Sequence, residues 1–222
     1  MLALVAARNE AGRVGATVEA IRRLPDVDEV VVVDGASTDG TAEEARAAGA
    51  RVLLAPRAGG KGGALEGAVA RLDPPEVYLL LDADLGPTAA EAGALVEAVV
   101  RGRLDLAIGD LPPQPGHGGL GLVKRTAGAA IRTLCGYQAS EPLSGQRALW
   151  REVMEAVRPL APGFGVEVGM TVDAVRAGFR VGEVRVNMIH APTGRDLAGF
   201  AHRARQGLDV LGAAGPRLLG RP

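Results

Sequence analysis

The sequence contains a single cysteine, Cys135, among its 222 residues. No disulfide can form within such a chain, and this favours a reducing, cytoplasmic setting. Cys135 lies in an apolar helical pattern, so we expect a core side chain rather than a nucleophile. No apolar run approaches the roughly 20 residues that a membrane-spanning helix needs, and the apolar start of the chain is too short for a signal peptide.

An excess of charge is also lacking. The 25 basic and 26 acidic residues leave a formal net charge of −1, which excludes the broad basic surface that nucleic acid binding requires. Lysine is scarce and occurs only at Lys61 and Lys124. The length suits one domain, or two tightly fused halves, with a substantial core.

Two common nucleotide-binding patterns are missing. The Walker pattern is absent around Lys61, because Gly62 takes the place of its Ser or Thr. No Gly-x-Gly-x-x-Gly follows the first expected strand, which argues against a dinucleotide-dependent oxidoreductase. An ATPase loop and a dinucleotide site are therefore not expected.

Short apolar runs alternate with amphipathic helical patterns along the chain. Strands are expected at 2–7, 29–33, 51–54, 77–81, 104–108 and 180–187. Helices are expected at 14–24, 41–48, 63–71, 88–100, 120–135, 151–157, 166–177 and 197–211. The helix from 41 is expected to be capped by Asp39, or by Thr41 with Glu44 in capping-box spacing. The same spacing, with Thr88 and Glu91, is expected to open the helix from 88. The alternation predicts an α/β fold, a single compact domain with a Rossmann-like, mostly parallel sheet flanked by helices.

Polar side chains follow three of the expected strands, as Asn9-Glu10, Asp34, and Asp82 with Asp84. Because the carboxyl ends of parallel strands meet at one edge, we expect these groups to share a crevice. Asp82 and Asp84 point to the same side of an extended segment, and two such carboxylates require a cation nearby unless they form a solvated turn. Mg²⁺ and Mn²⁺ prefer oxygen ligands. The crevice is suited to a nucleotide diphosphate whose departure a metal ion assists.

Five segments in order resemble the family 2 glycosyltransferases, which have the GT-A fold. They are Ala7–Glu10, Val33–Thr41, Gly60–Gly62, Asp82–Asp84 and Leu143–Arg147. The stretch 163–170, followed by a strand and His190, is similar to glucosyl-3-phosphoglycerate synthases, and the final third also resembles bacterial polyprenyl-phosphate sugar transferases. The resemblance implies metal-dependent transfer of a hexose from a UDP- or GDP-sugar to a phosphorylated small molecule or a polyprenyl phosphate.

The resemblance also implies roles for individual residues. Asp84 and His190 would ligate Mg²⁺ or Mn²⁺ and, together with Glu167, would form the catalytic set. The residues that would bind the nucleotide-sugar are Ala7, Asn9, Glu10, Asp34, Lys61, Asp82, Ala83, Ser144, Gly145 and Arg195. Residues 1–110 would be the nucleotide-binding half, and residues 111–222 the acceptor-binding half with the C-terminal helix.

Two other functions stay open from the residues. A sugar-1-phosphate nucleotidyltransferase is expected to carry a Gly-rich, Arg-containing loop after its first strand, and Arg8-Asn9-Glu10 does not supply one. A non-catalytic nucleotide-sugar-binding module would not need the Asp-x-Asp pair and His190. For a transferase, an inverting course needs a base such as Glu167 or Asp173, whereas a retaining course could rely on the leaving diphosphate.

Two segments carry further expectations. The Pro/Gly-rich loop 111–119 is predicted to be mobile and to shape the acceptor pocket. The basic end of the chain, with Arg203, Arg205 and Arg217, leaves open a homodimer or a peripheral contact with anionic lipid.

Overall fold

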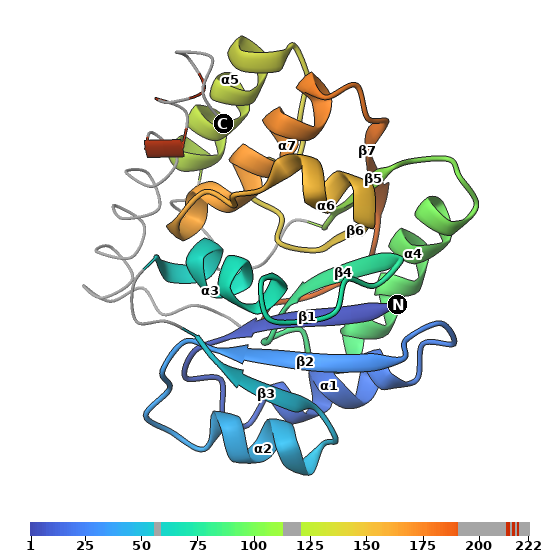
Figure 1. Cartoon of the computed structure of the whole chain (residues 1–222), viewed down its shortest axis with the longest axis vertical. Coiled ribbons are helices and arrows are strands. Elements are labelled where there is room, and N and C mark those ends of the chain that lie inside the picture. The colour runs from blue at the N-terminus through green and yellow to red at the C-terminus, as the bar shows by residue number, and fades with distance from the viewer. Residues whose placement is uncertain (56–58, 113–120, 191–211, 214, 216, 218–222) are drawn as a thin grey trace.

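Seven strands form one sheet in the computed structural model of the chain, which describes residues 1–55, 59–112, 121–190, 212, 213, 215 and 217 (Figure 1). The strand order is β3-β2-β1-β4-β6-β5-β7. The strands are β1 (Leu2–Ala7), β2 (Glu29–Asp34), β3 (Arg51–Leu54), β4 (Val77–Asp82), β5 (Leu106–Asp110), β6 (Arg147–Trp150) and β7 (Val181–Arg185). β6 runs antiparallel to β4 and β5, and the other pairs are parallel. The predicted α/β fold with a mostly parallel sheet is confirmed.

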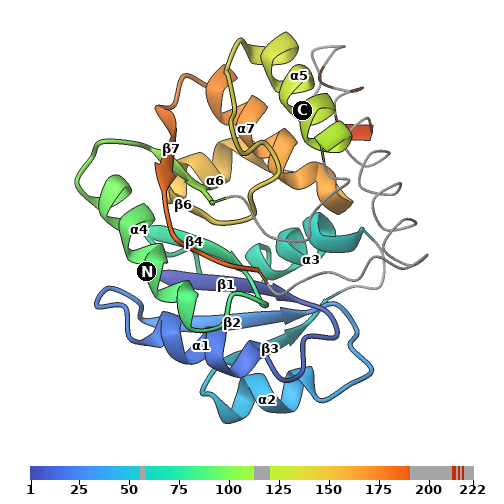
Figure 2. The ribbon, with the colours of Figure 1, turned by 180° about the vertical axis from the view of Figure 1, so that it is seen from behind.

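Helices cover both faces of this sheet (Figures 1 and 2). One face carries α1 (Val14–Arg22), α2 (Thr41–Ala47), the 3₁₀ helix η1 (Gly86–Ala92) and α4 (Gly93–Val100). The other carries α3 (Gly60–Val69), α6 (Arg151–Val157), the short 3₁₀ turn η2 (Gly163–Gly165) and α7 (Val166–Arg176). A further helix, α5 (Gly121–Cys135), packs on the outer side of α7. Cys135 lies in this last contact, as expected for a packing side chain.

The two faces of the sheet have separate apolar cores because side chains alternate along each strand. In β1, Ala3 and Val5 face the α1 side, whereas Leu2 and Leu4 face the α3 side. The valines of β2 divide in the same way between the two cores. Burial on both faces explains why these strands are continuously apolar in the sequence.

The strand β6 is not predicted by the sequence pattern, and its position changes how the two halves relate. It belongs to the proposed acceptor half, yet it lies between β4 and β5 of the proposed nucleotide half. β7 of the second half likewise pairs with β5. The halves therefore share one sheet and are not structurally separable, although their division of labour stays a prediction.

Neither predicted capping box forms, whereas Asp39, the alternative cap for the helix α2, accepts a hydrogen bond from the Thr41 backbone N–H (3.1 Å). Glu44 does not reach back to its own helix; its carboxylate accepts hydrogen bonds from the backbone N–H groups of Gly12 and Gly15 (2.8 Å for Gly15) at the start of α1. Thr88 donates its hydroxyl to the carbonyl of Leu85 (2.6 Å) within η1. In the first case a contact between two helices replaces a local cap, which sequence spacing cannot reveal.

Arg217 is not the exposed basic residue that the sequence suggests. It is 3% exposed, and its guanidinium pairs with the Asp173 carboxylate of α7 (Nε–Oδ1 2.8 Å). Gly169 leaves the space for this side chain, because an added Cβ there would lie 2.8 Å from the Arg217 Nη2 atom. The predictions for 113–119, Arg195 and the helix 197–211 with Arg203 and Arg205 lie outside the described residues. No helix within the described ranges is both long and apolar enough to cross a membrane.

Arg217→Ala is expected to lower the free energy of unfolding by about 3 kcal/mol, because it leaves the Asp173 carboxylate buried without its counter-charge. Urea denaturation measures the effect. Arg132→Ala, at an exposed arginine of α5, is the matched control and should change the free energy by less than about 0.5 kcal/mol. Equal effects of the two substitutions would contradict the role of the buried pair.

Candidate active site

The carboxyl ends of β2, β1 and β4 lie side by side, as the sequence predicts. Ala7 of β1 pairs with Asp34 at the end of β2, and Ala6 pairs with Asp82 at the end of β4. The loops that leave these three strands therefore border one crevice. The β1–β4 boundary is also where successive connections change direction in the sheet, and open α/β sheets bind ligands at such a point.

The loops after β1 and β2 are fastened to each other by side chains. Asn9 accepts a hydrogen bond at its amide oxygen from the Thr38 backbone N–H (2.9 Å), and its own N–H donates to the Ser37 hydroxyl (2.9 Å). Asp34 is 3% exposed and accepts from the Ser37 backbone N–H (3.1 Å). Asn9 and Ala36 both have positive φ, of 56° and 60°, a conformation that costs a non-glycine residue about 1 kcal/mol or more. The hydrogen bonds hold this strained rim in place.

Glu10 connects the rim to the carboxylates of β4. Its backbone N–H donates to the Thr41 hydroxyl (2.8 Å), and its carboxylate forms an ion pair with Arg13 (3.1 Å). Burial raises the pKa of Glu10, and the negative charge of Asp84 raises it further, against the lowering effect of Arg13. The crevice is therefore rich in negative charge on this side, which favours a cation.

Asp84 and His190 meet although 106 positions separate them. Asp84 Oδ1 lies 2.9 Å from His190 Nδ1. Burial opposes protonation of His190, but the hydrogen bond to Asp84 and the negative charges of Asp82 and Asp84 together raise the pKa of the imidazole. Two ligands each about 2.1 Å from an octahedral ion and at right angles to each other are about 3 Å apart, so this pair fits a divalent cation. Within the described ranges, no group of three or more His, Cys, Asp or Glu side chains could hold a metal, and substrate phosphates would have to complete the coordination.

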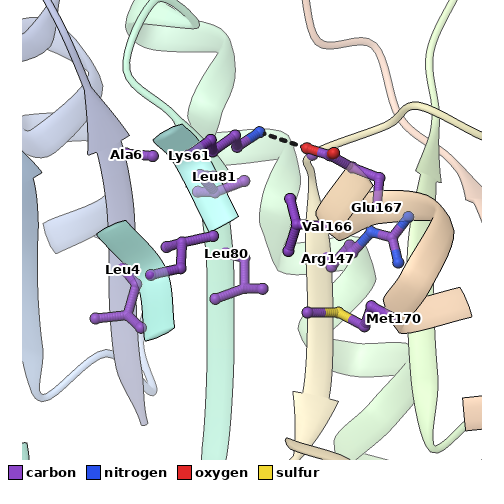
Figure 3. Close-up of a pocket in the computed structure, with 11 residues that line it drawn as sticks. Leu4, Ala6, Lys61, Leu80, Leu81, Arg147, Val166, Glu167 and Met170 are labelled. Carbon is purple, nitrogen blue, oxygen red and sulfur yellow. Dashed lines mark ion pairs between the residues drawn. The ribbon is translucent and has the colours of Figure 1, made fainter. Parts of the chain in front are cut away.

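Lys61 bridges two carboxylates from different elements, and Figure 3 shows its ion pair with one of them, Glu167. Its Nζ atom lies 2.6 Å from Asp82 Oδ1 and 2.8 Å from Glu167 Oε1, which is on the first turn of α7. Burial alone would raise the pKa of Asp82. The positive charges of Lys61 and His190, with the hydrogen bonds from Lys61 and Gln146, together lower it to about 2. The same two carboxylates raise the pKa of Lys61 above its usual value, against the effect of burial. Lys61 thus balances the charges of both carboxylates, and its expected contact with the nucleotide-sugar stays a prediction.

Arg147 lies beneath this ion-pair cluster and is 1% exposed. It donates to the Ser144 carbonyl (3.0 Å) and the Thr171 hydroxyl (3.0 Å), and burial lowers its pKa to about 10. A cavity of about 10 Å³ adjoins it, with Lys61 and Glu167 in its wall. Among the described residues, three buried polar atoms lack a hydrogen-bond partner: Ser144 Oγ, Arg147 Nη2 and Glu167 Oε2. Buried polar groups normally have partners, so a water molecule or a substrate hydroxyl is the expected one.

Among the residues that the structure describes, the remaining ones predicted to bind the donor lie at the same edge. The side chains of Ala7 and Ala83 belong to the core, so only their backbone groups are available to a ligand. Gly145 allows Lys61 and Asp82 to approach, because an added Cβ would overlap Lys61 Nζ and lie 2.8 Å from Asp82 Oδ2. Asp173, the other candidate base, is paired with Arg217.

Gln146 lies at this edge and within the matching segment Leu143–Arg147, but no role was predicted for it from the sequence. It is fully buried, and it accepts a hydrogen bond from the Asp82 backbone N–H (3.0 Å) while donating to Asp82 Oδ2 (2.6 Å). The same Nε2 atom lies 3.3 Å from His190 Nε2. An uncharged glutamine gives no signal in a search for charged or metal-ligating side chains. Gln146 immediately precedes β6, and because this strand was not predicted, the sequence could not place Gln146 beside Asp82.

Comparisons with known proteins agree with this geometry. Residues 3–153 match the family model described as glycosyl transferase family 2. The glucosyl-3-phosphoglycerate synthase of Mycolicibacterium paratuberculosis is 35% identical over 92% of this chain and 69% of its own length. The crystal structure of the Mycobacterium tuberculosis synthase with phosphoglyceric acid has a TM-score of 0.81 at 30% identity, covering 100% of this chain and 80% of that chain.

A second structure of the Mycobacterium tuberculosis enzyme contains Mn²⁺ and UDP-glucose. It matches with a TM-score of 0.80 at 30% identity over 100% of this chain and 79% of that one. The GT-A type fold expected from the sequence is confirmed by these matches. The family model covers more than half of the chain. The chain belongs to glycosyl transferase family 2.

Proposed function

We propose that this glycosyltransferase moves a hexose from a UDP- or GDP-sugar to a phosphorylated small molecule, with Mg²⁺ or Mn²⁺ held by Asp84 and His190. The observation that carries the proposal is the 2.9 Å contact between Asp84 Oδ1 and His190 Nδ1. It gives two ligands at a spacing that suits one octahedral ion, at the edge where α/β sheets bind nucleotides. When bound, the ion would neutralise the diphosphate as it leaves.

The other residues of the site bind and orient the donor in this proposal. The loops after β1 and β2 would form the nucleoside pocket with Ala7, Asn9, Glu10 and Asp34. Lys61, Asp82, Ala83, Ser144 and Gly145 would lie along the sugar and diphosphate. Arg195, which lies outside the described residues, would clamp the diphosphate.

The acceptor follows from the relatives. Solved structures of the related synthase contain UDP-glucose with Mn²⁺, and phosphoglyceric acid. We therefore infer a UDP-hexose and a small phosphorylated acid as the first pair to test. A polyprenyl phosphate is the alternative acceptor, and a homodimer or a peripheral membrane contact through 197–211 stays a prediction.

The charge pattern favours a retaining course over an inverting one. An inverting transferase needs a free carboxylate to take the acceptor proton. Glu167 is bound to Lys61 at 2.8 Å, and Asp173 is bound to the buried Arg217, so the charge of each candidate base is already balanced. In our proposal the leaving diphosphate takes the acceptor proton instead.

A calorimetric screen of nucleotide-sugars with Mn²⁺ tests the proposal. We expect wild-type protein to bind a UDP- or GDP-hexose and Asp84→Ala to bind it more than about 100-fold more weakly, since replacing even the groups that support metal ligands costs 10–100-fold. Asp26→Ala, at an exposed aspartate, is the control and should bind as the wild type does. No binding by the wild type, or equal binding by Asp84→Ala, would overturn the metal site. Pyrophosphate release from a nucleoside triphosphate and a sugar phosphate would instead indicate the nucleotidyltransferase.

A further inference from the structure

The structure assigns to Gln146 the role of a positioning residue: it holds the His190 imidazole in the tautomer that carries its proton on Nδ1. In this tautomer Nδ1 cannot bind a metal ion, so His190 has to leave Gln146 before it becomes a ligand. The inference rests on the proposed function for one point only, that Asp84 and His190 hold the metal. The contact between Gln146 and His190 stands apart from it.

The orientation of the Gln146 amide follows from Asp82. The Asp82 backbone N–H needs an acceptor, and Gln146 Oε1 lies 3.0 Å from that nitrogen. The amide nitrogen is then 2.6 Å from Asp82 Oδ2, which accepts its first hydrogen. Exchanging the amide oxygen and nitrogen would place an oxygen against a carboxylate and a donor against a donor, so the network allows one orientation.

The second amide hydrogen of Gln146 is directed to His190. Gln146 Nε2 lies 3.3 Å from His190 Nε2, so in a neutral ring this nitrogen must be the acceptor. The proton of the imidazole is then on Nδ1, where it is donated to Asp84 Oδ1 at 2.9 Å. Gln146 and Asp84 therefore hold the two ends of the ring in one tautomer.

This tautomer is the wrong one for ligation through Nδ1. A metal ligand needs a free lone pair, and metal-bound imidazoles nearly always donate their other N–H to a carboxylate, a carbonyl or water. Here the group that faces His190 Nε2 is the Gln146 amide N–H, which is a donor. If Nδ1 bound the metal, Nε2 would carry the proton and two N–H groups would face each other. The ring must shift away from Gln146 or turn over before it can bind the ion. Gln146 is buried and tied to Asp82, so it cannot turn with the ring.

Gln146→Glu converts the lock into a support. One carboxylate oxygen can still accept from the Asp82 N–H. The other replaces the amide nitrogen that donated to Asp82 Oδ2, so the Asp82 carboxylate has to turn this oxygen away. The new oxygen can then accept from a His190 Nε2–H, giving the carboxylate–histidine–metal arrangement. We expect the affinity for Mn²⁺, measured by electron paramagnetic resonance titration, to rise about 10-fold. Gln138→Glu adds the same charge at an exposed glutamine and should leave the affinity unchanged.

The tautomer itself is measured in metal-free wild-type protein by long-range ¹H–¹⁵N correlation of the histidine rings, at a pH where they are neutral. Only three histidines are present, and His190→Asn identifies the relevant signals. We expect the proton on Nδ1 in the wild type and on Nε2 in Gln146→Glu. A wild-type proton on Nε2, or a Mn²⁺ affinity of Gln146→Glu that is unchanged or lower, would overturn the assignment. Should the variant fail to fold, the wild-type spectrum decides alone. If wild-type protein binds no Mn²⁺, the proposed metal site is wrong, but the assignment of the His190 tautomer to Gln146 still stands.

Discussion

Lys61→Met is expected to lower the free energy of unfolding by about 3 kcal/mol, because it leaves two largely buried carboxylates facing each other without a counter-charge. Lys61 is the cation that binds both Asp82 and Glu167, whose side chains are 25% and 5% exposed. We also expect nucleotide-sugar binding to fall more than 10-fold, since Asp82 loses the partner that orients it. Chemical denaturation and calorimetry measure the two effects.

The double variant Lys61→Met/Glu167→Gln separates charge balance from ligand binding. It removes one positive and one negative charge, so the cluster formed by Asp82, Lys61, Glu167 and Arg147 returns to neutrality. Most of the lost stability should be recovered, whereas donor binding should stay weak. If the double variant were as unstable as the sum of the single ones, the coupling between Lys61 and Glu167 would be disproved.

Gly62→Ala should lower the free energy of unfolding by about 3 kcal/mol, which is the upper end of the usual costs of overpacking. Gly62 is buried on α3 where this helix meets the chain ahead of η2. An added Cβ would overlap the Ala161 carbonyl oxygen and lie 2.9 Å from its carbonyl carbon. Backbone atoms cannot move aside locally, so α3 itself would have to shift. Thermal unfolding and the loss of soluble yield measure this.

Gly145→Ala is the informative contrast. The three atoms nearest to the new Cβ are at the ends of the Lys61 and Asp82 side chains, which can move at a cost of less than about 1.5 kcal/mol. Stability should therefore change little, while the displaced ion pair should weaken donor binding by at least 10-fold. A Gly145→Ala protein that unfolds as readily as Gly62→Ala would show that steric overlap, and not the ion pair, dominates at this position.

The positions of the strand ends could be predicted because continuous apolar runs stop abruptly at polar residues. The rule that the carboxyl ends of parallel strands share an edge was enough to predict that Asp34, Asp82 and the Asn9-Glu10 pair lie close together. Lys61 and His190 were predicted at the site from family resemblance, but the ion pairs of Lys61 depend on how α3 faces α7. The spacing of residues in the sequence does not predict how these two helices face each other.

The errors arise where distant contacts override local patterns. Glu44 has ideal capping spacing, but its carboxylate accepts a hydrogen bond from the Gly15 backbone N–H at the N-terminus of α1. Arg217 has the composition of an exposed basic tail but is buried against Asp173. β6 is only four residues long and begins with an arginine, so it resembles a loop until its two neighbouring strands are known. Gln146 was missed together with β6, since the strand gives it its place.

The insertion of β6 also has a consequence for biosynthesis. β5 precedes β6 in the chain but lies beyond it in the sheet, so β4 and β5 can be joined only after residue 150 has been made. A nascent chain can pair β1 with β2 and β4, and β2 with β3, whereas β5 must wait for β6, and His190 follows β7. Such non-local pairing is slow to form. The crevice is therefore among the last parts of the molecule to be completed, and Asp84 meets His190 only when the whole sheet has closed.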